Sequence, residues 1–452
     1  MDALNEFENA LTGRIDDMLD ACTRCGACFS ACPITGAAGI GDADAQAVVG
    51  GVLDIVRSGD GPEASRKWAS ACVMSGECIK ACDYGVNPRF LLTVARIAMT
   101  KVARDVPQRR RQGVEAFRKL NRDVTVLSRL QLSDEVLERL GQKPSARNEV
   151  GTPDVVFYTG CNVLKTPHIA LLCLDIMDAL GVSYQVMGGP THCCGVLQLR
   201  SGDTETSGRF AGNTMAKLAR SKSGRVLSWC PSCFVQFTEV MLPTFERAGS
   251  PPPFEMTPFI RFLHSELDRL RPLLRHRVAM RVALHGHPGV TGIVDAAKDL
   301  LRAVPGIELV DLGQPAVGLQ SNNLQVLPAY KRELQLKELE AARDAGVNAL
   351  AAVYHSDHRE LCAHERDWPF RIVNMLEIIG ESMGMRQEDR YKHLKMTQDA
   401  DAVLAECHDL VARHGLDGTT ARAVVDAMIA DQPLPLRGRK EAATSGVSPP
   451  AG

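Results

Sequence analysis

The stretch Thr191-His192-Cys193-Cys194-Gly195 decides how this chain is interpreted, because two adjacent cysteines followed by glycine are unusual. Cys161 precedes the pair and a Cys230-Pro231-Ser232-Cys233 run follows it, so five thiols come from three segments. Thiols at fixed spacings in a chain without a secretory leader indicate a soft metal or an iron–sulfur cluster before disulfides. Gly195 suits such a site, because backbone close to a cluster leaves no room for a Cβ. A buried vicinal disulfide and a zinc site are the alternatives.

Strands and helices are expected to alternate around the paired cysteines. The expected strands cover 155–158, 183–187 and 225–229, and the expected helices cover 168–180 and 207–221. This alternation predicts a parallel sheet, in which sites gather at the carboxyl ends of the strands. Cys161 and Cys230 both follow an expected strand, so a single site can draw on all three segments.

A second unit of the same kind follows the first. Its expected strands are 281–284, 307–312 and 349–354, and its expected helices are 292–303 and 333–345, with a helical apolar pattern at 366–384. The stretch 314–320 echoes the one at the paired cysteines. In this alignment Ala316 and Val317 replace Cys193 and Cys194, and His355 and His358 replace Cys230 and Cys233. The fold is therefore expected to be kept while every cysteine is lost.

Two further cysteine arrays lie near the N-terminus. The first is Cys22-x2-Cys25-x2-Cys28-x3-Cys32-Pro33, and the second is Cys72-x2-Ser75-x2-Cys78-x3-Cys82. In such arrays three thiolates hold one cluster and the fourth reaches across to another. One complete [4Fe–4S] site is therefore expected from Cys22, Cys25, Cys28 and Cys82.

The second cluster site of this crossed arrangement has only three thiolates, because Ser75 replaces a cysteine. These are Cys72, Cys78 and Cys32. Three thiolates suit a [3Fe–4S] cluster, or a [4Fe–4S] cluster with serine, water or a partner's group on the last iron. In the alternative, Ser75 only caps a helix and the site stays empty. Helical spacing of apolar residues at 3–20, 45–57 and 90–101 predicts a mostly α-helical scaffold for both arrays.

Composition limits the classes of function. The formal net charge of −2 gives no support for nucleic-acid binding, and the basic run 109–111 indicates a solvated face or a partner contact. Fifteen cysteines and an acidic, polar opening segment indicate reduced thiols in the cytoplasm.

The most apolar expected helix contains Asp175 and Asp178, so no membrane span is expected. No Gly-x-Gly-x-x-Gly fingerprint follows an expected strand, so a flavin would belong to a partner.

The motifs resemble the CCG cysteine-rich domain of heterodisulfide reductases. Behind two cysteine arrays, the layout is similar to the catalytic subunit of membrane-linked heterodisulfide reductase, and to the iron–sulfur subunits of glycolate oxidase and anaerobic glycerol-3-phosphate dehydrogenase. The resemblance implies a noncubane [4Fe–4S] cluster at which a disulfide is reduced. Its implied ligands are Cys161, Cys193, Cys194, Cys230 and Cys233, with Cys193 and Cys194 as the catalytic pair. Ser75 and the cysteine-free second unit depart from the family's pattern.

The expected fold class is therefore α plus α/β. We expect an α-helical ferredoxin-type domain at 1–150, a first CCG domain at 151–272 and a second, degenerate CCG-like domain at 273–387. A helical extension at 388–432 and a disordered tail at 433–452 complete the chain. The segment Gly151-Thr152-Pro153 has the composition of a linker and marks the first boundary.

Four histidines lie at two expected strand ends of the second unit, where the first unit carries thiolates: His285, His287, His355 and His358. Exchange of cysteine for histidine suits zinc or non-haem iron, and haem less well. The alternative, equally weighted, is that they are polar residues left at a site that no longer binds metal.

Two functions of an oxidoreductase subunit fit these features. In the first, which the sequence favours, the chain relays electrons between a flavoprotein partner and a quinone or another carrier. In the second, it is a catalytic subunit that reduces a disulfide or processes a sulfur substrate at the noncubane cluster. An iron–sulfur scaffold or sensor is a third class. Both main functions require partner subunits, and a membrane subunit would place the chain at the inner face of the membrane.

Overall fold

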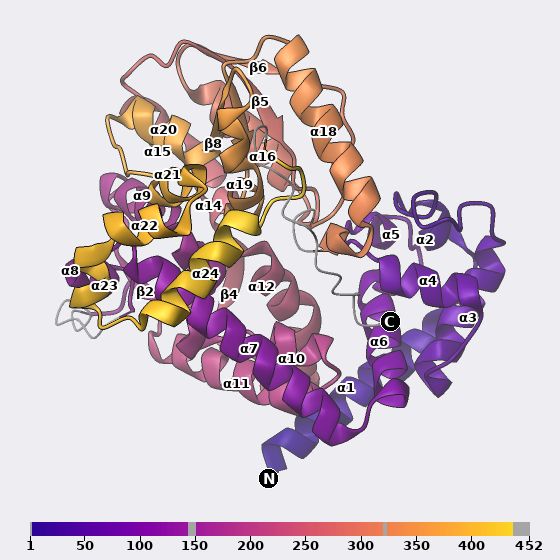
Figure 1. The fold of residues 1–452 in the computed structure, drawn as a ribbon. Coiled ribbons are helices and arrows are strands. Elements are labelled where there is room, and N and C mark those ends of the chain that lie inside the picture. The colour runs from indigo at the N-terminus through magenta and orange to yellow at the C-terminus, as the bar shows by residue number, and fades with distance from the viewer. Residues whose placement is uncertain (1, 143–150, 320–322, 437–452) are drawn as a thin grey trace.

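The computed structural model describes residues 2–142, 151–319 and 323–436, which form two small parallel sheets surrounded by helices (Figure 1). In Figure 1 the N-terminal helices α2 to α6 lie at the right, the second sheet lies at the top, and the C-terminal helices lie at the left. The α plus α/β class is confirmed at this level. No helix in the described ranges is long and apolar enough to cross a membrane.

Both sheets have four strands and the same strand order. The first runs β2-β1-β3-β4, with β1 at Val155–Tyr158, β2 at Tyr184–Met187, β3 at Arg225–Ser228 and β4 at Glu255–Pro258. The second runs β6-β5-β7-β8, with β5 at Met280–His285, β6 at Ile307–Val310, β7 at Ala349–Ala352 and β8 at Arg371–Asn374. Every pairing is parallel. The strands of each unit therefore present their carboxyl ends to one edge of the sheet.

The sequence missed the last strand of each sheet, β4 and β8, although it predicted the opposite edge strands β2 and β6. The apolar pattern at 366–384 was expected to be helical throughout, but Ile372 lies in β8 and the helix α20 covers only Met375–Met383. Asn374 ends the strand and caps the helix in a capping box with Glu377. A buried strand of four residues shows no period of its own, so it merges with the helical pattern that follows.

The N-terminal helices build a core around the two arrays. They are α1 at Asp2–Ala21, α2 at Ala27–Ser30, α3 at Ala45–Ser58, α4 at Glu63–Ala71, α5 at Glu77–Lys80 and α6 at Pro88–Ala103. Asp44 caps α3, and Asn87 caps α6 with a proline at its first position, as helix starts commonly require. Val52, Leu53 and Trp68 are buried where α3, α4 and α6 meet.

Helix α7, Val106–Arg129, packs on the first sheet unit although it precedes residue 151 in the chain. It lies beside α10 (Val196–Arg200) and α11 (Thr204–Arg220), where Phe117 and Phe210 stack edge to face (Figure 1). Gly113 permits the approach, since a Cβ there would lie 2.9 Å from Ser201 Oγ. The short helix α8, Asp134–Arg139, follows it. Helix α7 thereby forms one wall beside the carboxyl edge of the first sheet.

The remaining helices flank the sheets and close the chain. The first unit carries α9 at Pro167–Ala179, α12 at Pro231–Val235, a π-helical turn at Gln236–Met241, α13 at Leu242–Arg247, α14 at Phe259–Ser265 and α15 at Leu267–Leu270. The second carries α16 at Ile293–Ala303, α18 at Pro328–Asp344, α19 at His355–Leu361 and α20. The extension contains α21 at Arg390–Thr397, α22 at Ala400–Glu406, α23 at His408–Arg413 and α24 at Gly418–Ala430. Short 3-10 turns lie at Asn162–Lys165, Pro190–His192, Arg271–Leu273, Leu324–Val326 and Cys362–Arg366.

The two sheet units share one hydrophobic core. Trp229 at the end of β3 packs edge to face on Tyr354 at the end of β7, with ring centroids 5.6 Å apart. Apolar residues of both units, including Phe259 and Met375, belong to the same buried cluster. The carboxyl edges of the two sheets are thus held together. Of the expected disordered tail, residues 437–452 lie outside the described ranges, as does residue 320 of the expected repeat.

Candidate iron–sulfur and substrate-binding site

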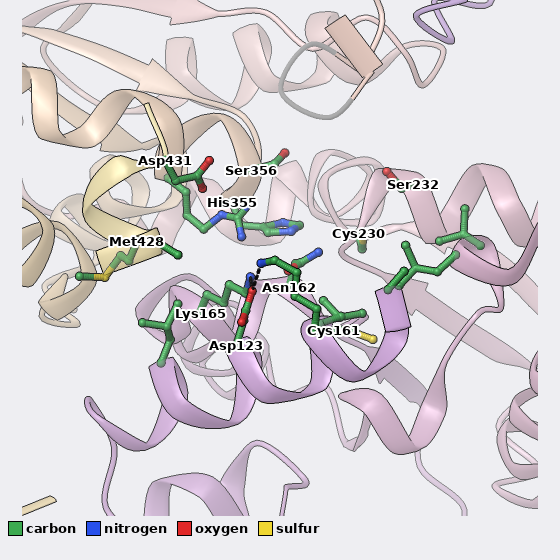
Figure 2. A pocket seen from close by; sticks show the side chains of 18 of the residues that line it. Asp123, Cys161, Asn162, Lys165, Cys230, Ser232, His355, Ser356, Met428 and Asp431 are labelled. Atoms are coloured by element: carbon green, nitrogen blue, oxygen red, sulfur yellow. Dashed lines mark hydrogen bonds and ion pairs between the residues drawn. The ribbon is translucent and has the colours of Figure 1, made fainter. Parts of the chain in front are cut away.

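Five cysteines of the first sheet unit line a single cavity of about 570 Å³ (Figure 2). Cys161 follows β1, the pair Cys193 and Cys194 follows β2 and a short turn, and Cys230 caps α12 directly after β3. Cys233 lies one turn further along α12, and all five side chains are buried. The edge of the parallel sheet therefore brings together the three segments that the sequence predicted to meet.

The five thiols form a continuous chain of contacts. Hydrogen bonds from Cys161 and Cys194 lower the pKa of Cys193. A hydrogen bond from Cys233 lowers the pKa of Cys230, and backbone N–H groups at the start of α12 act in the same direction. A contact between Cys194 and Cys233 joins the first three thiols to the pair Cys230 and Cys233. The same hydrogen bonds, together with burial, raise the pKa of Cys161, Cys194 and Cys233, so the thiols share protons with one another. The convergence of five sulfur atoms on one space is therefore what suits soft-metal coordination.

Gly160 leaves space that the thiols need, whereas Gly195 lies against α11 and not, as the sequence predicted, against the cluster site. A Cβ on Gly160 would lie 2.7 Å from Cys230 Cβ and 3.3 Å from Cys233 Sγ, and its φ of +69° is left-handed. A Cβ on Gly195, with φ +77°, would lie 2.5 Å from Ser207 O. Thr214 donates to Cys193 O at 2.9 Å and fixes the paired cysteines from α11. The chain thus forms a cradle of thiols without side chains in the way, and this donor set fits an iron–sulfur cluster.

The rest of the cavity wall contains both apolar and charged side chains. Basic side chains come from α7, the turn after β1, α10 and α19: Lys119, Lys165, Arg200 and Arg359. Two acidic residues, Asp123 and Asp431, also line it, and Lys165 Nζ lies 3.8 Å from Asp123 Oδ2. The wall therefore carries more basic than acidic groups, which favours an anionic occupant.

Lys165 is the unusual base in this wall. Burial, together with the nearby Arg359 guanidinium, lowers the pKa of Lys165 to about 7. The Nε of Arg359 is buried and makes no hydrogen bond to any residue in the described ranges. Both side chains therefore have capacity to bind groups that enter the cavity, and Lys165 can exchange a proton near neutral pH.

The cysteines of the two N-terminal arrays separate into two groups. Cys22, Cys25, Cys28 and Cys82 line one small cavity, which is the set expected from crossed ligation. Burial and the three neighbouring thiols raise the pKa of Cys28 to about 12 in the cluster-free chain. Cys78 is near Cys72 and Cys32, which make up the second group. The other cysteines, Cys173, Cys362 and Cys407, are buried elsewhere.

The two arrays have the same backbone conformation. Arg24 and Met74 have φ values of 60° and 62°, and Gly26 and Gly76 have φ values of 84° and 82°. A short helix follows each glycine. Ser75 therefore occupies the structural position of Cys25. Its Oγ lies 3.5 Å from the backbone N of Glu77, so the hydroxyl also meets the first turn of the following helix.

Arg89 connects the second array with both sheet units. From α6 it donates to Met74 O at 2.8 Å and to Gly289 O at 2.7 Å, and it forms a buried ion pair with Glu239. Leu319 N also donates to Val73 O at 2.8 Å. The second array is thus attached to the sheet units through several polar contacts.

The four histidines expected to bind metal have four different partners. His285 bonds Glu338 at 2.6 Å, and His287 bonds Asp357 at 2.8 Å. His355 accepts a hydrogen bond from Trp229 Nε1 at 3.2 Å and lies in the wall of the cysteine cavity (Figure 2). His358 bonds Asp389 at 2.7 Å. Although burial opposes it, Glu338 raises the pKa of His285 to about 9.

The expected equivalence of Cys230 with His355 is wrong by one residue. Arg225 pairs with Glu255 in the first sheet, and Ala349 pairs with Arg371 in the second. Arg225 and Ala349 therefore occupy equivalent positions in the two units. Five residues after each, at the N-cap of the following helix, Cys230 corresponds to Tyr354. The Tyr354 ring packs on Trp229 in the shared core, so the second unit has a core aromatic residue where the first has a cluster cysteine.

Comparisons with known proteins agree with this geometry. Residues 155–238 match the protein family described as a cysteine-rich domain, CCG. The chain is heterodisulfide reductase-like. A component of the dihydromethanophenazine:CoB–CoM heterodisulfide reductase of Methanosarcina mazei is 24% identical over 322 residues, which cover 65% of this chain and 75% of the relative. The proteins of the same name from Methanosarcina acetivorans and Methanosarcina barkeri are each 23% identical over the same shares. No solved structure matches the chain significantly.

The sequence did not reveal the charged wall of the cavity. Lys119 and Asp123 lie on a helix far from the cysteines in the chain, and Arg359 follows the second sheet, so no local motif connects them. Lys165 is the exception, because it lies one turn after Cys161 and could have been considered with it. Metal-ligand spacing also occurs at a group that the sequence missed, His168, Glu377 and Asp389 with His358.

Proposed function

We propose that this chain is the catalytic iron–sulfur subunit of a multi-subunit reductase and that it reduces a disulfide at the five-cysteine site. The observation that carries the proposal is the cavity: all five cysteines line one space of about 570 Å³ together with basic side chains. A cluster at the five thiols would occupy one end of this space, and the remainder, lined by side chains of α7 and α24, is room that a subunit relaying electrons to another carrier does not need. The cavity therefore favours the catalytic function over the relay that the sequence favoured.

The proposed substrate is an anionic disulfide or related sulfur compound. When bound by the five thiolates, a noncubane [4Fe–4S] cluster would supply electrons one at a time to a substrate sulfur. Lys119, Arg200 and Arg359 would bind the anionic groups and orient the S–S bond. Reduction breaks that bond with two electrons and two protons, and yields two thiols.

Lys165 would assist the proton balance of this reaction. With a pKa of about 7, its ammonium group can stabilise a thiolate product and give up a proton to it. Asp123, 3.8 Å from Lys165 Nζ, keeps the lysine directed along the cavity wall. The second sheet unit, as a CCG-like domain that lacks the cluster cysteines, would contribute Arg359 and His355 to the wall.

Electrons are proposed to pass from the first N-terminal cluster to the second and then to the five-cysteine site. The thiol of Cys25 is exposed, so the first site is open to a partner. Met74 of the second array and Ser232 of the Cys230–Cys233 run line a common small cavity, so the second site is the nearer one. The donor would be a flavoprotein or a membrane subunit that takes electrons from a quinol, at the cytoplasmic face of the membrane.

The test is thiol production by the assembled complex. The complex, with its partner subunits and clusters, is reduced chemically and mixed with anionic and uncharged disulfides, and free thiols are counted with a chromogenic reagent. We expect two thiols per disulfide, and we expect Arg359→Met to raise KM for the anionic disulfide about tenfold. The control is Arg110→Gln, because the Arg110–Glu205 ion pair is exposed on the outer side of α7. Rapid electron transfer to a quinone without thiol release from any disulfide would restore the relay as the function.

A further inference from the structure

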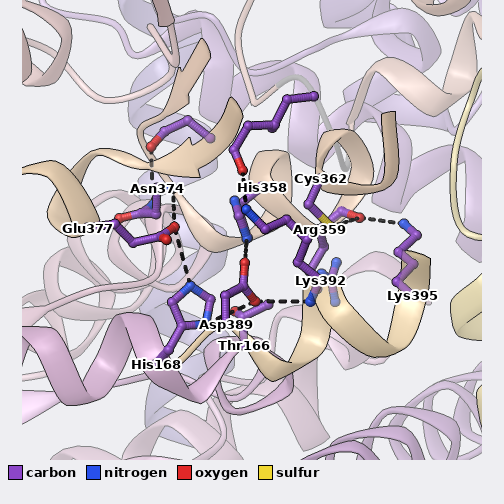
Figure 3. Close-up of polar contacts among 12 residues, drawn as sticks. Thr166, His168, His358, Arg359, Cys362, Asn374, Glu377, Asp389, Lys392 and Lys395 are labelled. Atoms are coloured by element: carbon purple, nitrogen blue, oxygen red, sulfur yellow. Dashed lines mark hydrogen bonds and ion pairs between the residues drawn. The ribbon is translucent and has the colours of Figure 1, made fainter. Parts of the chain in front are cut away.

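Four side chains outside the cysteine cavity converge with the spacing of metal ligands. They are His168 in the first turn of α9, His358 in α19, Glu377 in α20 and Asp389, which caps α21. One ligand atom from each lies within 4.8 Å of the others (Figure 3). Only His358 belongs to the set of histidines that the sequence indicated.

The two imidazoles of this group are buried and poorly satisfied. His168 is 1% exposed and His358 is fully buried. Neither ring nitrogen of His168, and not Nδ1 of His358, makes a hydrogen bond to a residue in the described ranges. The oxygens nearest to His168 are Asp389 Oδ1 at 3.4 Å and Glu377 Oε1 at 3.7 Å. Buried polar groups without hydrogen bonds are costly, so this arrangement calls for a ligand.

The two carboxylates are held in position by the backbone. Glu377 Oε1 accepts from Asn374 N at 2.7 Å within the capping box. Asp389 Oδ1 accepts from Lys392 N at 3.0 Å, while its Oδ2 faces His358 Nε2 at 2.7 Å. The side chains of Asp389 and Glu377 are 5% and 15% exposed. Carboxylates anchored in this way remain available as ligands without further ordering cost.

We propose that His168, His358, Glu377 and Asp389 bind a zinc ion. Two imidazole nitrogens and two carboxylate oxygens are donors that zinc accepts, and four protein ligands in a buried place suit its closed tetrahedral geometry. Iron(II) and manganese would require further ligands. Zinc bonds of about 2.0–2.2 Å place ligand atoms about 3.3 Å apart. Asp389 Oδ2 and His358 Nε2, 2.7 Å apart, would therefore separate slightly, while the group as a whole, within 4.8 Å, requires a contraction of up to about 1.5 Å. The unbonded ring of His168 can supply it.

The zinc ion would fasten the first sheet unit to the second and to the C-terminal extension. His168 comes from the first unit, His358 and Glu377 come from the second, and Asp389 begins the extension. Helix α9 packs on α20, where a Cβ on Gly380 would lie 2.9 Å from Leu172 Cδ2. The turn that carries Lys165 leads directly into α9. The ion would thus stabilise the wall of the substrate cavity.

An acidic cavity provides access for the ion. Glu377 and Asp389 line a space of about 840 Å³ together with Glu365, Glu381 and Glu388. Arg371, Arg386 and Lys392 also line it, so carboxylates outnumber basic groups by five to three. Carboxylates around the opening concentrate cations near the site. The proposed site therefore has four donors, carboxylates anchored by backbone groups and a route for entry, as a metal site requires.

Metal analysis of the complete chain tests the proposal. The chain, produced with its partner subunits and intact iron–sulfur clusters, should contain about one zinc ion by elemental mass spectrometry. The double variant Glu377→Gln/Asp389→Asn should lose that zinc and keep its iron. The control is His285→Gln, because His285 is also buried and paired with a carboxylate but lies outside the group. Wild-type protein with iron but without zinc would overturn the proposal.

X-ray absorption at the zinc edge distinguishes this site from the cysteine sites. Only nitrogen and oxygen neighbours at about 2.0 Å are expected, whereas sulfur at about 2.3 Å would show that zinc had entered a cluster site and would overturn the proposal. If the double variant does not fold, the wild type answers the same question. Treatment with a zinc chelator should remove the ion and lower Tm by several degrees with iron retained. An unchanged Tm after zinc loss would contradict a role in fastening the units.

Discussion

At the scale of single residues, the site depends on positions where a side chain would obstruct the thiols. Gly160 is the clearest example, because it lies against both Cys230 and Cys233. The sequence pointed to all five cysteines and to Gly195, because the CCG spacing is local. It did not point to Lys165 or Arg359 as wall residues, because their nearness to the cysteines arises only from the fold.

Gly160→Ala should eliminate the cluster of the five-cysteine site while both N-terminal clusters form. The added Cβ would lie 2.7 Å from Cys230 Cβ, which the buried wall cannot relieve by rotating a flexible side chain. The control is Gly224→Ala, because Gly224 has nearly the same φ of +68° and no atom within 4 Å of an added Cβ. A left-handed alanine costs about 1–2 kcal/mol in both variants. Iron content and electron paramagnetic resonance measure the outcome, and equal cluster loss in both variants would contradict the steric explanation.

Ser75→Cys should give the second array a fourth thiolate. Ser75 has the backbone position of Cys25, so the new sulfur would point where Cys25 points in the first array. A three-iron signal in the oxidised wild type should be replaced by the signal of a reducible four-iron cluster. Ser75→Ala serves as the control for loss of the hydroxyl. Two ordinary four-thiolate clusters in the wild type would mean that another ligand exists.

The affinity for an anionic disulfide should fall as pH rises through about 7. Lys165 has a pKa of about 7, so it is cationic below that pH and neutral above it. KM should therefore rise above neutrality in the wild type, and Lys165→Met should have the high KM at every pH. An uncharged disulfide is the control, because its KM should not follow the lysine. A wild-type KM for the anionic disulfide that stays constant across this range would show that Lys165 adds nothing to anion binding by Lys119, Arg200 and Arg359.

At the scale of elements, the central strands of both sheets follow from the alternation of apolar runs and helices. The edge strand β8 could not be separated from α20, because a strand of four residues, three of them buried, is too short to show a period of its own. The packing of α7 on the first unit was also beyond the sequence, since an amphipathic helix does not reveal which surface it covers. The sequence also did not show that α24, in the C-terminal extension, lines one side of the cavity.

Arg89→Met should destabilise the junction between α6 and the sheet units. It leaves the largely buried Glu239 carboxylate with the neutral amide of Asn87 in place of its ion-pair partner, which costs about 3 kcal/mol. Urea unfolding measures the loss, and Arg57→Met is the control because the Arg57–Asp54 pair is exposed and is worth about 0–1 kcal/mol. Arg89→Met/Glu239→Met should recover part of the stability. Equal losses in Arg89→Met and Arg57→Met would show that the ion pair does not hold the junction.

At the scale of the whole molecule, three cysteine groups lie in an order that suits one-way electron flow. Cys25 of the first group is exposed, the second group is attached to the sheet units, and the third lines a cavity that carries more basic than acidic side chains. The relay and the catalytic function are therefore parts of one process. The central claim is that electrons leave the chain at the five-cysteine site to reduce a sulfur substrate.

The most direct test of this claim is disulfide turnover by an assembled complex that carries Cys194→Ser. Cys194 lies between Cys193 and Cys233 in the chain of thiol contacts, so its loss should break the terminal site and no other. The account predicts that the N-terminal clusters are still reduced by the partner, that their resonance signals are unchanged, and that no thiols are released. Thiol release at the wild-type rate would contradict it.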